Sequence, residues 1–375
     1  MKFSVSSTLL LKQLSAINGV IGGNTLIPIL ENFLFKLEDG LLTATASDLQ
    51  TVMITTVEVD SKENGSIAVP ARLLLETLRS LPEQPVSIKI DEETFGIELI
   101  TENGRYKLAG ENPIDFPKTP TVNKNLSVEL TANVLSSTIA NTIFAASSDD
   151  LRPAMTGLYI NFSTENTTFV ATDGHKLVRI IRDDIKAATE TTMILPKKAL
   201  NLLKSSLPSD STPVTADFGA SHASFTFGSI QMFCRLIDER YPDYNNAIPT
   251  QNPNVLSINR QEFLNALKRI SIFSNKTTYQ IRLKLADETL QLSAEDIDYS
   301  NEANEKLACD YEGEALEIGF NSKFMAEMIG NLSCKAINVE MSAPNRAGLI
   351  IPKEQAEHED LLMLIMPVML NNYGS

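Results

Sequence analysis

The segment ATDGHKL, residues 171–177, combines residue types whose spacing could support chemistry. It places Asp173 and His175 on either side of a glycine, and His175 is one of only three histidines in the chain. An Asp-x-His pair could be half of a catalytic or a metal site. It could also be a hairpin turn on which a histidine happens to lie. The surrounding sequence has to decide between these two hypotheses.

The rest of the chain gives little support to catalysis. A metal site generally needs three or four converging ligands, and the other histidines, His222 and His358, lie in unrelated contexts. The sequence has no HExxH, CxxC, P-loop, GxSxG or GxGxxG pattern. We therefore expect no enzyme activity, no catalytic residue, no metal site and no cofactor. An enzyme that uses Asp173 and His175 stays as a weaker hypothesis.

Length and composition are those of a globular protein with several domains. The chain has 375 residues, of which 43% are hydrophobic and 21% charged. No apolar run approaches the ~18 residues of a membrane span, and the N-terminus lacks the features of a signal peptide. The three scattered cysteines, Cys234, Cys309 and Cys334, fit buried free thiols in a reducing cytoplasm.

One pattern of elements occurs three times along the chain. A hairpin pattern of alternating apolar residues around a polar turn ends at Asp48, Asp173 and Asp296, at spacings of 125 and 123 residues. A strand followed by an amphipathic helix recurs in step, as does a closing strand. The strand–helix junctions align at Pro70, Pro196 and Phe320, and the closing strands end at Pro117, Pro242 and Pro367.

These registers predict three α+β domains with two helices each. Each copy opens with a strand and a helix, for which Ser7, Thr131 and Asn259 are plausible N-caps. Polar linkers near 119–125 and 250–254 separate the copies. The expected domains are residues 1–121, 126–249 and 254–370, followed by a short tail at 371–375.

Charge is divided unevenly between the predicted helices and the remainder. The net charge of −15 argues against nucleic acid when taken as a whole. The six helices nevertheless carry 11 basic and 3 acidic residues, a net +8, which leaves −23 elsewhere. Such one-sided helices indicate a surface that faces a polyanion, while the sheets face solvent. The helices are predicted at 7–19, 71–81, 131–148, 196–206, 259–275 and 321–335.

The three-copy pattern and six short stretches resemble the family of bacterial DNA polymerase III beta subunits, the replicative sliding clamps. The stretches are LIPILENF (26–33), VPAR (69–72), ATDGHKL (171–177), LPKK (195–198), RYPDY (240–244) and LIMPVML (364–370). The resemblance covers nearly the whole chain apart from the tail NNYGS. It implies a homodimeric ring of six similar domains, with antiparallel sheets outside and helices around duplex DNA inside.

The resemblance also implies the function and the partners. A clamp tethers polymerase to its template by topology, so weak contacts to phosphates that ignore the base sequence suit its sliding. The expected partners are double-stranded DNA, the DNA polymerase III catalytic subunit, the clamp loader, other replication and repair proteins, and a second copy of the chain. The expected location is the cytoplasm. The alternative is a repeat-built scaffold that binds proteins and never encloses DNA.

Three groups of residues take roles from the resemblance. The peptide-binding pocket would comprise Met155, Thr172, Gly174, His175, Lys176, Leu177, Pro242, Leu364, Ile365, Met366, Pro367, Val368, Met369 and Leu370. The DNA-facing residues would be Lys12, Arg72, Arg79, Lys197, Lys198, Lys204, Lys268 and Arg269. At the dimer interface, Tyr106 and Leu108 would meet Ile272 and Phe273 of the other copy, although these four fit a domain core equally well.

Comparison of the three copies favours a structural turn in the opening motif. The equivalent turns SDLQT (47–51) and EDIDY (295–299) contain the Asp but no histidine. His175 would then contribute shape and a polar edge to the pocket. Several residues depart from the family's usual pattern, which indicates altered peptide preference and altered DNA contacts. They are Asn24, Pro153, Ala154, Asn245, Asn246, Ala247 and Met369.

Overall fold

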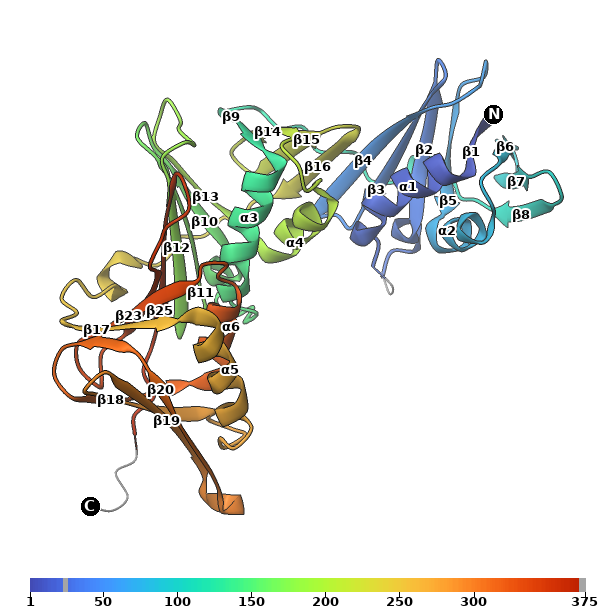
Figure 1. Cartoon of the computed structure of the whole chain (residues 1–375). Helices are drawn as coiled ribbons and strands as arrows, with labels where there is room; N and C mark the ends of the chain where they lie inside the picture. Colours follow the sequence, from blue (N-terminus) through green and yellow to red (C-terminus); the bar gives the residue numbers. More distant parts are fainter. Residues whose placement is uncertain (23–25, 371–375) are drawn as a thin grey trace. The chain divides into compact units, whose positions relative to one another are not determined.

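The structure, a computed structural model, describes residues 1–22 and 26–370 (Figure 1). Asn24 and the predicted tail at 371–375 lie outside the described residues. Within these ranges the chain runs three times through one order of elements, in which a strand and a helix precede four strands, a second helix and three strands. The repeat predicted from the hairpins is therefore a repeat of whole domains.

The first and second copies have the same ten elements. The first consists of β1 (Lys2–Ser6), α1 (Ser7–Ile17), β2 (Asn32–Glu38), β3 (Leu41–Ser47), β4 (Thr51–Glu58), β5 (Gly65–Pro70), α2 (Ala71–Ser80), β6 (Pro85–Ile90), β7 (Gly96–Ile100) and β8 (Arg105–Ala109). The second consists of β9 (Leu126–Thr131), α3 (Ala132–Thr142), β10 (Gly157–Phe162), β11 (Thr167–Thr172), β12 (Lys176–Arg182), β13 (Thr191–Pro196), α4 (Lys197–Ser206), β14 (Pro213–Phe218), β15 (His222–Phe227) and β16 (Ile230–Arg235).

The third copy adds one short strand, β21, to this order. It consists of β17 (Asn254–Asn259), α5 (Arg260–Ser271), β18 (Gln280–Ala286), β19 (Thr289–Asp296), β20 (Asn301–Ala308), β21 (Asp310–Glu312), β22 (Leu316–Asn321), α6 (Ser322–Gly330), β23 (Ala336–Met341), β24 (Gly348–Pro352) and β25 (Glu359–Ile365).

Helices α1, α5 and α6 start after side chains that accept hydrogen bonds from the first backbone N–H groups, whereas α2 starts after Pro70 without such a cap. Asn259 caps α5 as predicted, since its side chain accepts from the backbone amides of Gln261 and Glu262. The cap of α1 is Ser6 rather than the predicted Ser7, because the Ser6 hydroxyl accepts from Leu9 N. The strand–helix junction of the third copy is Asn321 rather than Phe320. Asn321 pairs across its sheet as Pro70 and Pro196 do, and it caps α6.

Each copy builds two half-sheets, which we name by their position in the chain. The hairpin half-sheets have the orders β5-β2-β3-β4, β13-β10-β11-β12 and β22-β18-β19-β20. The flanking half-sheets have the orders β1-β6-β7-β8, β9-β14-β15-β16 and β17-β23-β24-β25, with β21 beside β17. Neighbouring copies join edge to edge, because β4 pairs with β16 and β12 pairs with β25. The sheets therefore continue from one copy into the next.

The continuous sheets divide the chain into two compact units. The first contains residues 1–136 and 198–236, and the second contains residues 137–197 and 237 onward. The middle copy is thus split, since its flanking half-sheet belongs to the first unit and its hairpin half-sheet to the second. Hydrogen bonds between strands of different copies, rather than sequence repeats, set these units.

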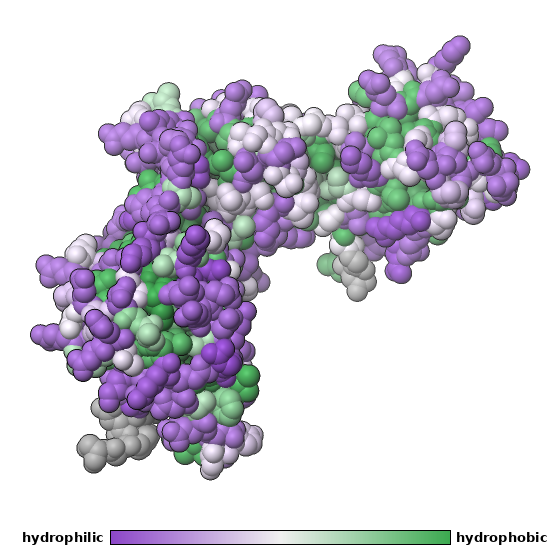
Figure 2. Space-filling model, viewed as in Figure 1, coloured by the Kyte–Doolittle hydropathy of each residue, from purple (hydrophilic) through white to green (hydrophobic). Residues whose placement is uncertain are grey.

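The helices pack on one face of the half-sheets and form the core there. In the first unit α1 packs against α2, β3 and β4, and in the second α5 packs against α6, β18, β19 and β20. The apolar side of α5, with Leu267 and Ile270, is buried with Leu283 and Leu292 of the sheet. Hydrophilic side chains cover most of the surface visible in Figure 2.

All three cysteines are free, but only Cys234 is buried, while Cys309 and Cys334 are half-buried. Burial raises the pKa of the Cys234 thiol to about 12. Across residues 1–22 and 26–370, no helix has the length and apolar character that a membrane span requires.

Candidate functional site

The turn between β11 and β12 uses Asp173 to hold its own backbone. One carboxylate oxygen of Asp173 accepts from the amides of His175 and Lys176, both at 2.9 Å. Gly174 has a φ of +90°, which a glycine adopts without strain. Asp48 does the same in the first copy, since it accepts from the amides of Gln50 and Thr51. The prediction of a structural turn aspartate is confirmed for Asp173 and Asp48, whereas in the third copy Asp296 is buried and accepts from the Asn275 side chain at 3.4 Å.

His175 is exposed and lies beside helix α6. Among the described residues, no carboxylate forms a hydrogen bond with its imidazole ring. Its ring stacks on Phe324 at a centroid distance of 6.2 Å. Its carbonyl accepts from Met366 N at 2.9 Å, which ties the turn to the end of β25. Among residues 1–22 and 26–370, no group of three or more His, Cys, Asp or Glu side chains is arranged to hold a metal. The turn and the C-terminal strand therefore form one surface.

An apolar cluster lies on the sheet face that carries Leu177. The pairing of β12 with β25 sets Leu177 opposite Leu364. The pocket cluster, as we call it, consists of Val170, Leu177, Ile194, Tyr241, Ala347, Leu349, Leu362 and Leu364. Six partly buried residues pack against it, namely Ala154, Tyr159, Ile237, Tyr244, Ile248 and Ile351. The segment after β16 thus returns over the sheet and bounds the cluster.

Three tyrosines make one wall of this cluster. Tyr159 and Tyr241 stack at 4.7 Å with an interplanar angle of 19°, and Tyr244 meets both rings at 6.0 and 6.5 Å. The Tyr241 hydroxyl donates to the carbonyl of Val170 at 3.3 Å, and burial raises the pKa of Tyr241. This wall was not predicted from the sequence. Tyr241 and Tyr244 belong to the stretch RYPDY, and Tyr159 lies on strand β10.

The C-terminal residues of the predicted pocket differ in exposure. Leu364 and Ile365 are buried in the sheet, whereas Met366 and Met369 are exposed. Pro367, Val368 and Leu370 are half-buried, and Val368 N donates to Gly319 O at 2.8 Å. The strand thus places flexible methionine side chains beside a buried leucine, an arrangement that suits an adaptable apolar surface.

Two predicted pocket residues, Lys176 and Ile365, pair across the strands and point to the face opposite the pocket cluster. Successive strand residues point to opposite faces, and the Lys176 amine accordingly faces helix α6, where it pairs with Glu327 at 2.6 Å. The amine also lies over the Phe324 ring, 4.9 Å from its centroid. Lys176 is buried, so its side chain braces the turn from behind.

Arg152 supports the turn from a neighbouring loop, and sequence reasoning did not single it out. Its Nε donates to Asp149 at 3.0 Å, and its Nη1 donates to the carbonyl of Asp173 at 3.3 Å. The same nitrogen lies 3.9 Å from the sulfur of Met155. Thr172 and Pro242, buried and half-buried, complete the predicted set. Only a three-dimensional contact links Arg152 to a turn 21 residues away.

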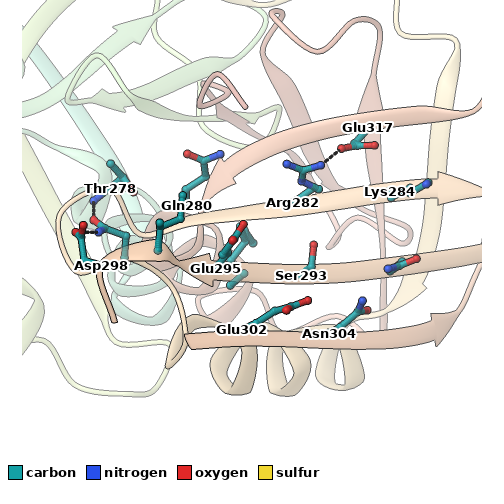
Figure 3. Close-up of a pocket in the computed structure, with 15 residues that line it drawn as sticks. Thr278, Gln280, Arg282, Lys284, Ser293, Glu295, Asp298, Glu302, Asn304 and Glu317 are labelled. Atoms are coloured by element: carbon teal, nitrogen blue, oxygen red, sulfur yellow. Dashed lines mark hydrogen bonds and ion pairs between the residues drawn. The ribbon is translucent and has the colours of Figure 1, made fainter. Parts of the chain in front are cut away.

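The same face is polar in the third copy (Figure 3). By strand pairing, Tyr159, Val170 and Leu177 correspond to three polar residues, Arg282, Ser293 and Glu302. A hollow of about 620 Å³ lies there, and Arg282 pairs with Glu317 beside it. The hollow's other lining residues include Gln280, Lys284, Gln291, Glu295, Asp298 and Asn304. Of these two copies, the middle one presents the apolar site.

Most of the predicted DNA-facing residues are exposed on helices. In the first unit Lys12, Arg72, Arg79 and Lys198 are exposed and Lys204 is half-buried, and in the second unit Lys268 and Arg269 are exposed. Lys197 differs because its amine donates to the carbonyl of Ala146 at 2.8 Å and its burial lowers its pKa. Three of these cations have acidic partners, in the pairs Arg72–Glu76, Lys198–Asp48 and Arg269–Glu305.

Of the predicted interface residues, Tyr106 and Leu108 lie on β8, whereas Ile272 and Phe273 directly follow helix α5, which packs against β20. Tyr106, Ile272 and Phe273 are exposed, whereas Leu108 is buried. Tyr106 belongs to β8, which ends one four-stranded sheet, and β20 ends the other. In the other copies, the equivalents of β8 are β16 and β25, and the equivalents of β20 are β4 and β12. All four strands are paired, β4 with β16 and β12 with β25.

Known proteins match this chain over nearly its full length. Family models described as the N-terminal, central and C-terminal domains of the DNA polymerase III beta subunit match residues 1–120, 129–243 and 245–369. A protein of Vibrio cholerae named "Beta sliding clamp" is 30% identical over 372 residues, which cover 99% of this chain and 100% of the relative. The equally named protein of Escherichia coli is 28% identical over 373 residues, with the same coverage.

A solved structure has the same fold over the same length. The crystal structure of the DNA polymerase III subunit beta from Pseudomonas aeruginosa superposes with a TM-score of 0.94 at 28% identity. The match covers 99% of this chain and 100% of that one.

Proposed function

This chain belongs to the DNA polymerase III beta subunit family of DNA sliding clamps, and we propose that two copies close a ring around duplex DNA. As a clamp the protein is a non-catalytic processivity factor that binds DNA and polymerase. The unpaired edges of β8 and β20 carry the proposal of ring closure. Each junction between copies within the chain joins a hairpin half-sheet to a flanking half-sheet, and the third copy's hairpin half-sheet can complete that pattern only with another chain.

Charge and exposure support pairing of β8 with β20 of a second copy. β8 carries Arg105 and Lys107, a net +2, whereas β20 carries Glu302, Glu305 and Lys306, a net −1, so the two edges have opposite net charges. The exposed Tyr106 supplies apolar surface on one side. Ile272 and Phe273 supply it on the other side. A long edge left open would invite aggregation, which closure of the ring prevents.

The helix faces favour weak contact with DNA. Pairing of Lys198, Arg269 and Arg72 with carboxylates leaves a modest positive charge on the exposed helix residues. Each phosphate contact adds to the salt dependence of binding, so few free cations mean low affinity. A ring holds DNA by enclosure and does not need high affinity, whereas an open scaffold with these helices would release DNA readily.

The pocket cluster is the proposed docking site for clamp-binding proteins. We infer that short peptides of the polymerase catalytic subunit, the clamp loader and other replication and repair proteins bind there. Met155, Thr172, Gly174, His175, Leu177 and Pro242 bound the site together with Leu364–Leu370. A groove with methionines and leucines accepts varied apolar anchors. The equivalent face of the third copy is polar, so of these two copies only the middle one offers such a groove.

Retention on circular DNA tests enclosure. The protein is loaded on a nicked circular plasmid by its cognate loader, washed in high salt, and the plasmid is then linearised. A clamp stays on the circle and is lost after cutting, because only the circle blocks its exit. Loss from both forms, with the loader shown to act on a known clamp, would favour the protein-binding scaffold.

A further inference from the structure

An arginine interrupts the apolar face that holds the pocket cluster. Arg179 follows Leu177 by two residues on β12, so both side chains point to the same face of the sheet. Its strand neighbours are Val170 on β11 and Leu362 on β25, and both belong to the pocket cluster. Arg179 therefore lies at the end of the cluster that is farther from the turn.

The guanidinium of Arg179 has few acceptors for its donors. Its Nη2 lies 3.5 Å from a carboxylate oxygen of Asp360, at the limit of a hydrogen bond. Its Nε is buried and has no hydrogen-bond partner among the described residues. A guanidinium has five N–H donors in a fixed fork, and a buried donor without an acceptor is costly. The side chain is 19% exposed, so a ligand can reach it.

The groups around Arg179 neutralise its charge only in part, since its one acidic partner among the described residues stands 3.5 Å away. Tyr244 of the tyrosine wall packs against the pocket cluster, which also contains Val170 and Leu362, the strand neighbours of Arg179. Asp360 has an exposed side chain that can turn toward solvent. In the overlying segment, residues 245–247 are Asn, Asn and Ala, and the nearby acid, Asp243, accepts a hydrogen bond from the Asn246 amide at 2.8 Å.

We propose that Arg179 is a specificity-determining residue of the pocket, which receives an acidic side chain of the bound client peptide. This inference rests on the proposed peptide-binding function of the pocket cluster. Two residues along a strand span ~7 Å, so the acid would stand one to three positions from the apolar anchor that contacts Leu177. Because the Nε is buried, the peptide carboxylate would accept from the terminal nitrogens of Arg179, in competition with Asp360.

The test compares matched peptides on the full-length protein. The probe is a fluorescein-labelled peptide from the C-terminal tail of the cognate polymerase catalytic subunit. Each position near its apolar anchor is replaced in turn by Asp and by Asn, and fluorescence anisotropy gives the Kd of each. At one position the wild-type protein should prefer Asp over Asn by about 5- to 10-fold, as expected for a charge-assisted hydrogen bond.

Three variants separate specificity from structure. Arg179→Gln should abolish the preference for Asp and leave the affinity for the Asn peptides within twofold. Asp360→Asn should increase the preference, because it removes the competing carboxylate, whereas a purely structural ion pair predicts no change. Lys186→Gln removes an exposed cation of the same unit and should leave the preference unchanged.

The outcomes also distinguish this proposal from the function on which it rests. If the wild-type protein binds the Asn peptides but shows no preference for Asp at any position, the role of Arg179 is wrong and the pocket stands. A preference for Asp that survives Arg179→Gln has the same meaning. If the protein binds none of the peptides, the pocket assignment itself fails.

Discussion

Truncation of Met366 to alanine should weaken peptide binding without weakening the fold. Met366 is 41% exposed at the end of β25, beside the turn that carries His175. That fraction of a methionine surface is roughly 80 Å², and its burial at ~25 cal/mol per Å² stabilises a complex by about 2 kcal/mol. We therefore expect the Kd of a polymerase-tail peptide to rise by about 30-fold.

The choice of Met366 over Leu177 follows from burial. Leu177 is already buried in the pocket cluster without a ligand, so Leu177→Ala should cost about 2–5 kcal/mol of folding stability in addition to any loss of binding. Its effect on the Kd would mix two causes. Met366 is only partly covered before binding, so Met366→Ala should disturb the fold less than Leu177→Ala and report more directly on binding.

Calorimetric titration of the peptide and thermal unfolding together test this reasoning. The matched control is Leu41→Ala, which truncates a 42% exposed apolar residue at the start of β3 in the other unit. The control should change neither the Kd nor the Tm appreciably. An unchanged Kd for Met366→Ala, in a protein that unfolds like the wild type, would show that the peptide site lies elsewhere.

Three further predictions concern the edges, the helices and a thiol. Tyr106→Glu at the β8 edge should halve the mass measured by light scattering from about 82 kDa to the 41.2 kDa of one chain, and an unchanged mass would refute the proposed seam. Lys198→Glu combined with Lys268→Glu should shorten retention on circular DNA while peptide affinity stays constant, and full retention would contradict DNA-facing helices. The Cys234 thiol, with its pKa raised to about 12 by burial, should resist iodoacetamide at pH 8 until the protein unfolds, as mass spectrometry of the labelled peptide can show.

The sequence predicts the local parts of the fold well because local rules determine them. The hairpin turns follow from Asp48 and Asp173, whose carboxylates can reach the amides two and three residues ahead. Asn259 is the expected cap of α5 for the same reason. The cap of α1 shifted by one residue because Ser6 and Ser7 offer the same hydroxyl. The junction at Asn321 shifted because Phe320 continues the apolar pattern of its strand.

Contacts between distant segments could not be read from the sequence. The pairing of β12 with β25 joins residues more than 170 positions apart, and it creates the face on which Arg179 and Leu177 meet the C-terminal strand. The ion pair of Lys198 with Asp48 likewise depends on how two copies join. Strand alternation alone predicts the face to which Lys176 points. Because its neighbour Leu177 points into the pocket cluster, Lys176 must point to the opposite face of the sheet.

Continuation of the sheets across the sequence repeats limits how the protein can be cut. A fragment that ends at the polar linker 119–125 would strip β4 of its partner β16 and leave a bare strand edge. The middle copy alone would carry two such edges, β12 and β16. Bare edges of this length recruit other chains, so fragments designed on the repeat boundaries should precipitate or form mixed oligomers. The repeats of the sequence therefore do not mark the places at which the protein could be divided into stable pieces.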